Sequence, residues 1–183
     1  MKRCSAIALV LASAAGATPA KKELYRAQKA LDSRSAARGR VGVVTIYNEK
    51  TREALAISDG QVPTLAQASA LLPCPFTGEQ AYFDVQLLAT AVAAARTFRC
   101  NRVEVVSGYR SPKYNRLLRK KGREVAQHSL HTLGRALDFR IPGVSVAELR
   151  RFLGRRGSFG VGLYPHSDFI HVDSGPPRRW VGW

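Results

Sequence analysis

The sequence predicts an α+β fold: a single small domain with a central antiparallel sheet flanked by helices. Two observations predict it. Short runs rich in β-branched residues are separated by glycine, proline and asparagine, as strands are by turns. Segments with apolar residues at helical spacing lie between some of these runs, but strand and helix do not alternate regularly, which argues against a parallel α/β sheet.

The length and composition of the chain favour one domain with a buried core, since it has 183 residues and 45% of them are hydrophobic. The start of the chain has the pattern of an export signal. Two basic residues precede an apolar stretch shorter than the ~20 residues of a membrane span, and small residues follow it. We therefore expect a signal peptide at residues 1–20, a mobile lead-in at 21–40 and the folded domain at 41–183.

The first half of the folded domain should contain two strands, an irregular excursion and a helix. Residues 42–47 and 54–57 are the expected strands, joined by a polar turn. Residues 61–77 hold three prolines, so we expect them to be irregular. Residues 84–98 have apolar side chains at helical spacing behind a capping aspartate, which indicates a helix.

The second half should add two helices and four strands. Residues 113–123 show one apolar face among many basic side chains, and Ser145 and Glu148 have the spacing of a capping box that opens another helix. β-branched or alternating runs indicate strands at residues 102–106, 136–141, 160–164 and 169–172.

The chain is strongly basic, with 29 Lys and Arg against 13 Asp and Glu and a formal net charge of +16. A charge of this size favours polyanionic partners. Three explanations fit this charge. The partner is nucleic acid, or it is the carboxylates and phosphates of a cell wall, or the charge reflects an arginine-rich proteome and has no specific meaning. The basic face of residues 113–123 is likewise either a solvated surface or a patch that rests on an anionic polymer. Charge alone does not choose among these.

Removal of the signal peptide would leave two cysteines, Cys74 and Cys100, on either side of the expected helix at 84–98. An even number of cysteines in an oxidising compartment favours a disulfide, which would stabilise the fold by about 3 kcal/mol. Two buried free thiols are the alternative.

All four histidines lie in the last third of the chain, among several aspartates. Hydrolytic zinc sites commonly use three histidine or carboxylate ligands and leave one position for water. Gly134 would end a helix, so His131 is expected on a loop and Asp138 on the strand that follows it. His171 and Asp173 share a strand face by two-residue alternation, so Asp173 can orient His171 from behind.

Three segments of the chain resemble a known family in their order and spacing. They are residues 107–115 (SGYRSPKYN), 129–138 (SLHTLGRALD) and 160–175 (GVGLYPHSDFIHVDSG), with Arg179 and Trp180 after them. They are similar to the zinc murein peptidases, which include D-alanyl-D-alanine carboxypeptidases and phage endolysin endopeptidases, and within these to the branch typified by murein endopeptidase K. The resemblance spans residues 42–180 and is looser before residue 100.

The resemblance implies a zinc peptidase domain with one zinc ion in a cleft on the sheet. The implied zinc ligands are His131, Asp138 and His171. The implied catalytic residues are Asp168 as acid and base, Arg110 as the holder of the substrate or its oxyanion, and His166 beside the metal.

Four further expectations concern the surroundings of the metal. Ser129 is expected to support His131 by hydrogen bonding, and Asp173 to orient a ligand. Strict strand alternation would point Asp168 away from the metal, so it is expected on a loop before the last strand. His128 falls outside the family pattern and is expected to be structural or superficial.

The implied function is zinc-dependent hydrolysis of peptide cross-links in peptidoglycan by an exported enzyme, periplasmic or associated with the cell wall. A D,D-carboxypeptidase that trims stem peptides and a non-catalytic wall-binding module of the same fold are the alternatives. Nucleic acid is not an expected partner, because that hypothesis explains neither the histidines nor the export signal. No membrane span is expected after signal cleavage. The residues leave open whether the cross-link joins two diaminopimelate residues or D-alanine to diaminopimelate.

Overall fold

The computed structural model describes residues 41–122 and 125–182. The expected signal peptide and lead-in lie outside the described residues. In the part of the chain that is described, no helix has both the length and the apolar character required to cross a membrane.

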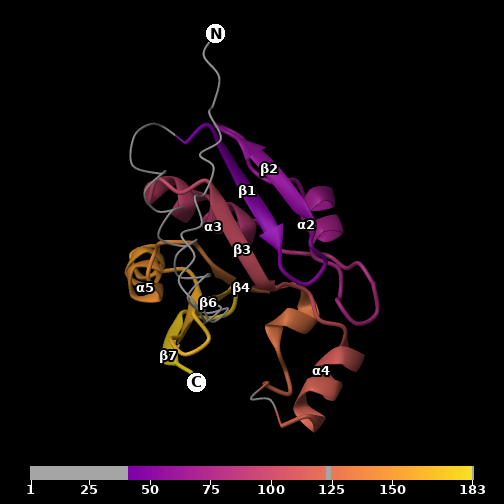
Figure 1. Ribbon diagram of the computed structural model, residues 1–183. Helices are drawn as coiled ribbons and strands as arrows, with labels where there is room; N and C mark the ends of the chain where they lie inside the picture. Colours follow the sequence, from indigo (N-terminus) through magenta and orange to yellow (C-terminus); the bar gives the residue numbers. More distant parts are fainter. Residues whose placement is uncertain (1–40, 123–124, 183) are drawn as a thin grey trace, which may run out of the picture.

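A mixed β-sheet forms the centre of the domain (Figure 1). Its strand order is β2-β1-β3-β4-β6-β5-β7. Over the described residues the strands are β1 (Val43–Asn48), β2 (Ala54–Ser58), β3 (Arg102–Ser107), β4 (Ala136–Arg140), β5 (Gly160–Tyr164), β6 (Phe169–Asp173) and β7 (Arg178–Val181).

The expectation of an antiparallel sheet is correct for four neighbouring pairs and wrong for two. β1 pairs with β3 in parallel, and β5 pairs with β7 in parallel. In each case the chain returns from the end of the first strand to the level of its start before the second strand begins. The two strands then run in the same direction, side by side. The crossover from β1 to β3 contains the hairpin partner β2 and two helices.

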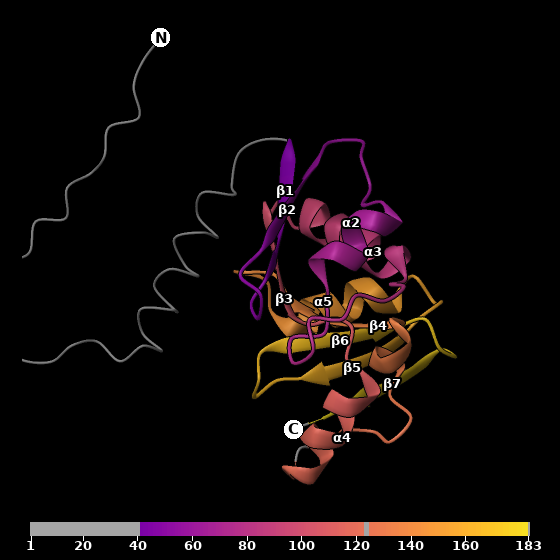
Figure 2. The ribbon, with the colours of Figure 1, turned by 90° about the vertical axis from the view of Figure 1, so that its right-hand side faces the viewer.

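Four α-helices and one short 3₁₀ helix accompany the strands in the described part of the chain. They are α2 (Leu65–Leu71), α3 (Val85–Thr97), α4 (Pro112–Lys120), α5 (Val146–Gly154) and the 3₁₀ helix η1 (Leu130–Leu133). Helix α3 packs on β1, β3 and β4, and α5 packs on β5 and β6. Helix α4 projects from the body of the domain in both views (Figures 1 and 2). Its cationic side chains are exposed.

Helix α2 lies inside the segment that the prolines led us to expect as irregular, so that expectation is wrong for residues 65–71. Thr64 caps the helix, and Gln67 closes a capping box with it. Pro63 and Pro73 stand outside the helix on either side, where the fixed proline backbone does no harm to it.

The two faces of the sheet differ, and this difference positions the site. Leu137 and Phe139 of β4 belong to the hydrophobic core, as do Ile170 and Val172 of β6. Because side chains alternate along a strand, the residues between them point to the other face. On β4 and β6 those residues include the carboxylates and the histidine that the sequence singled out.

The expected disulfide is wrong, because Cys74 and Cys100 are both free and buried. Cys74 donates to the Ser111 hydroxyl, with 3.3 Å between sulfur and oxygen. Cys100 instead faces the carbonyl oxygens of Phe98 and Pro142. Each thiol therefore packs among its own neighbours in the core, and the two do not meet.

Candidate metal centre

His131 is held in place by backbone on both sides. It lies in η1, whose last turn ends at Gly134 in the left-handed conformation, with φ of 65°. A side chain at that position would overlap the carbonyl oxygen of Tyr82, so the close approach requires glycine as well. The Nδ1–H of the His131 ring donates to the carbonyl oxygen of Gly108, at 2.7 Å. This hydrogen bond leaves the lone pair of Nε2 facing the sheet.

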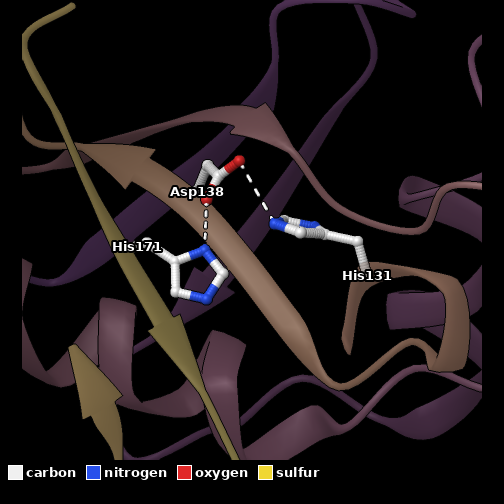
Figure 3. A group of neighbouring side chains, drawn as sticks. All are labelled: His131, Asp138 and His171. Carbon is white, nitrogen blue, oxygen red and sulfur yellow. Dashed lines mark hydrogen bonds and ion pairs between the residues drawn. The ribbon is translucent and has the colours of Figure 1, made fainter. Parts of the chain in front are cut away.

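Asp138 and His171 are direct neighbours across the β4–β6 ladder. Figure 3 shows the two side chains pointing toward each other and toward His131. His171 Nδ1 lies 2.7 Å from Asp138 Oδ1, and His131 Nε2 lies 3.3 Å from Asp138 Oδ2. One ligand atom from each of the three residues lies within 4.8 Å of the other two, so the group could hold a metal ion.

The Asp138 carboxylate is almost fully buried, at 3% exposure, and is charge-compensated. The Arg110 Nη2 donates to its Oδ2 at 2.7 Å, and the Nε of the same arginine donates to Ser107. Burial alone would raise the pKa of Asp138, but attraction to His131 and hydrogen bonds with both histidines outweigh it. They hold the pKa of Asp138 well below its ordinary value, so the carboxylate is ionised.

The two histidines have opposite electrostatic surroundings. Burial lowers the pKa of His131 against the pull of Asp138, so its ring is neutral at neutral pH. Burial also acts on His171, but hydrogen bonds with Asp138 and Asp173 outweigh it and raise its pKa to about 9. The Nε2 of His171 donates to Asp173 Oδ2 at 3.0 Å, as their shared strand face predicted.

The residues present fit a metal of the zinc type. His131 Nε2 and an oxygen of the ionised Asp138 carboxylate lie 3.3 Å apart, and both are atoms that coordinate cations. The Nε2 of His171 is bonded to Asp173, and a metal ion would take the place of the proton that Nδ1 shares with Asp138. Two imidazoles and one carboxylate are the ligand types of hydrolytic zinc sites, and the adjoining pocket leaves room for a further ligand.

A pocket of about 570 Å³ opens beside these three residues. Its size is in the range of sites for small molecules or peptide segments. Its walls come from the loop before η1, from β4, and from the strands β5, β6 and β7. The lining residues are Arg110, Val125, Ala126, His128, Ser129, Leu130, His131, Asp138, Tyr164, Ser167, Phe169, His171, Arg178 and Trp180.

Asp168 lies on the turn between β5 and β6, where the sequence placed it, and His166 lies on the same turn. Among the described residues, however, it is their neighbours Ser167 and Phe169 that line the pocket, not they themselves. Asp168 adopts a left-handed backbone, with φ of 51°. His128 is exposed, as expected of a superficial residue, but it lines the pocket, which the sequence did not predict.

The expected hydrogen bond from Ser129 to His131 is not what the structure shows. One ring nitrogen of His131 is bonded to the carbonyl of Gly108 and the other faces Asp138, so neither is left for Ser129. Ser129 is buried, lines the pocket and accepts hydrogen bonds from Thr132 through its backbone carbonyl.

Arg178 and Trp180 of β7 are part of the site, although no role for them was predicted. The Trp180 ring lies over His171, with 5.3 Å between ring centroids, and the Arg178 guanidinium makes two hydrogen bonds to Asp173. Both contacts depend on the pairing of β7 with β5, which no local pattern in the sequence reveals.

Comparison with known proteins found a family whose model matches the chain. A family model described as peptidoglycan L,D-endopeptidase MepK matches residues 44–180. The peptidoglycan L,D-endopeptidase MepK of Escherichia coli K12 is 45% identical over 78 residues, which are 43% of this chain and 43% of the relative. The probable peptidoglycan L,D-endopeptidase MepK of Haemophilus influenzae is 46% identical over 80 residues, 44% of this chain and 43% of that protein.

These alignments span less than half the length of either relative. No solved structure was found that matches the chain. The family model, in contrast, extends over most of the chain and over every residue of the candidate metal centre. The chain therefore belongs to the family of the peptidoglycan L,D-endopeptidase MepK.

Proposed function

We propose that the chain is an exported, zinc-dependent endopeptidase that hydrolyses peptide cross-links in peptidoglycan. The observation that carries this proposal is the buried group of His131, Asp138 and His171 at the wall of a pocket, in a chain of this family. The three side chains would hold one zinc ion. When bound, zinc would act as a Lewis acid and lower the pKa of water to ~7.

The chain's own residues would then handle the proton and the charge of amide hydrolysis. A carboxylate oxygen of Asp168 would take the proton of the attacking water and pass it to the leaving amine nitrogen as the C–N bond breaks. Its left-handed backbone supports this role, since residues in sparsely populated conformations gather at functional sites. Arg110, which lines the pocket, would hold the carbonyl oxygen as negative charge develops there, with His166 as a second candidate.

The substrate bond proposed is the one between two diaminopimelate residues. Such a bond joins an L centre to a D centre, which agrees with the L,D description of the matched family. A bond from D-alanine to diaminopimelate joins two D centres, and a carboxypeptidase would release a terminal residue instead. The basic surface of the chain suits the carboxylates of peptidoglycan, and export would bring the enzyme to the periplasm or cell wall.

Digestion of purified peptidoglycan tests the function. The full chain loaded with zinc should release muropeptides, and a chelator or His131→Ala should abolish the release. Mass spectrometry of the products should show loss of diaminopimelate–diaminopimelate cross-links. Terminal residues released from stem peptides would indicate a carboxypeptidase. Retention on the wall without any product would indicate a binding module, and either result would contradict the proposal.

Two matched variants test the acid–base assignment. Asp168→Asn should lower kcat about 10²- to 10⁴-fold while zinc content stays at one ion per chain. His128→Gln removes a histidine that lines the pocket, and its activity should stay within about threefold of the wild type. The reverse pattern would reject Asp168 as the base and point to His128.

A further inference from the structure

In the register of the sheet, β7 lies beside two glycines of β5, Gly160 and Gly162. Gly162 stands between His171 on β6 and Trp180 on β7 in one cross-strand row. Gly160 stands between Asp173 and Arg178 in the next. A side chain at Gly162 would overlap the Trp180 indole, and one at Gly160 would come within 2.8 Å of Arg178 Nη1. The two β7 side chains therefore reach across β5 to the site because β5 has no side chain there.

The hydrogen bonds of Arg178 leave one edge of its guanidinium free. Nη1 donates to Asp173 Oδ1 at 3.1 Å and to the Pro176 carbonyl, and Nη2 donates to Asp173 Oδ2 at 2.7 Å. In the part of the chain that is described, Nε–H and the second Nη2–H have no such partner. These two N–H groups are parallel and form the second fork of the guanidinium, which matches a carboxylate.

Arg178 belongs to the wall of the pocket, and its guanidinium is held in place from two sides. Arg178 lines the pocket, and its side chain is 48% exposed, whereas Asp173 beneath it is fully buried. The guanidinium also rests on the Trp180 ring, 4.8 Å from the ring centroid. An arginine fixed by a buried carboxylate and an aromatic face loses little conformational freedom when it binds a ligand.

We propose that the Nε–H and Nη2–H edge of Arg178 binds a carboxylate of the substrate peptide close to the scissile amide. The inference rests on the proposed peptidase function and names the group that the pocket would select. Arg178 and His171 share the same oxygen, Asp173 Oδ2, at 2.7 and 3.0 Å. A carboxylate on Arg178 would therefore lie within about three extended residues of the metal ligands, at 3.3–3.6 Å each.

Kinetics on matched peptides tests the proposal. Two pairs of synthetic cross-linked peptides are needed. In one pair the carboxylate on the leaving-amine side is either free or a carboxamide, and in the other pair the same change is made on the acyl side. Arg178→Gln should lower kcat/KM about 10- to 100-fold on the free carboxylate of one pair. On the matching carboxamide the loss of kcat/KM should be within about threefold. The peptide pair that shows this difference identifies which carboxylate Arg178 binds.

Two control variants distinguish paired hydrogen bonding by the guanidinium from the effect of positive charge alone. Arg178→Lys keeps the positive charge but not the fork, so it should recover only part of the activity on the free carboxylate. Arg179→Gln removes the neighbouring charge on β7, whose guanidinium bonds instead to the Phe159 carbonyl, and should behave like the wild type on every peptide. Zinc affinity by isothermal titration should stay within about threefold for Arg178→Gln.

Two results would overturn the inference: equal losses on all four peptides, or a loss of zinc affinity that accounts for the lost activity. Either would reduce Arg178 to a residue that positions Asp173. Binding of the same peptides to zinc-loaded Asp168→Asn, with and without Arg178→Gln, repeats the comparison without turnover. If the wild type cleaves none of the peptides, the proposed function fails. The subsite would still be supported if the double variant bound the free-carboxylate peptide more weakly and the carboxamide equally well. If binding of the two peptides did not differ in this way, the subsite would be refuted.

Discussion

The Asp138 carboxylate joins three side chains of the site. One buried carboxylate faces the side chains of Arg110, His131 and His171. Without it, the buried guanidinium and the charged His171 would lose their common counter-ion, and a buried charge left unpaired is costly. The carboxylate is therefore structural even when no metal is bound.

Asp138→Asn tests this by stability rather than activity. In metal-free protein, the variant should lose about 3 kcal/mol of unfolding free energy, measured by denaturant titration. Asp168→Asn is the matched control, because it is on a turn and asparagine also tolerates its left-handed backbone. It should change stability by less than about 1 kcal/mol. Equal losses in the two variants would contradict a structural role for the Asp138 charge.

At the residue scale, the sequence predicted what short-range spacing can determine. The spacing of His131 and Asp138, and the alternation of His171 and Asp173, indicated side chains that the structure brings together. The partner of His131 was missed because it is the backbone carbonyl of Gly108, and a carbonyl has no signature in a sequence.

Helix α5 shows an element whose start is defined by its own residues. Ser145 accepts from the Glu148 backbone N–H, and the Glu148 carboxylate accepts from both the backbone N–H and the hydroxyl of Ser145. These hydrogen bonds lower the pKa of Glu148, which is the sign expected for a carboxylate that stabilises the fold in its charged form.

Ser145→Ala should therefore cost about 1 kcal/mol of unfolding free energy at pH 7. The cost should shrink in acid, because the advantage of the charged Glu148 is present above its ordinary pKa and is lost as pH falls through its lowered value in the folded protein. Thermal denaturation at pH 7 and pH 3 measures both costs. A cost that stays the same at the two pH values would show that Glu148 takes no part in the cap.

Elements were predicted well where their signal was local and poorly where it was not. The ends of the expected strands lie within about one residue of the observed ends. The capping aspartate of α3 is where it was expected. Helix α2 was missed because prolines near its ends outweighed its capping box. Strand β7 was missed because it is a four-residue edge strand with three polar or aromatic residues, ordered only by its pairing with β5.

At the scale of the whole molecule, the metal centre joins segments distant in the chain. His131 precedes β4, Asp138 lies within it, and His171 comes from β6 after helix α5 and strand β5. A ligand that binds all three would stabilise the folded state, since the unfolded chain does not hold them together. The α+β class was predictable from the order of elements, but the two parallel pairings were not, because they depend on contacts distant in sequence.

Zinc should accordingly raise the melting temperature of chelator-treated protein. At a free zinc concentration 100 times the dissociation constant, the stabilisation would be about 2.7 kcal/mol. For a domain of this size that corresponds to a rise of roughly 10 °C in scanning calorimetry. His131→Ala should show no such rise. A similar rise in that variant would place the zinc elsewhere on the chain.

The two glycines of β5 that face β7 limit how the sequence can change in evolution. A side chain at Gly162 would overlap the Trp180 ring, and one at Gly160 would overlap both the Asp173 carboxylate and Arg178. A larger residue at 162 would then be tolerated only in a lineage whose residue 180 had already become small, and one at 160 only where residues 173 and 178 had both changed. We expect residue 162 to vary together with 180 among related chains, and residue 160 with both 173 and 178, because these contacts run across the strands of the sheet.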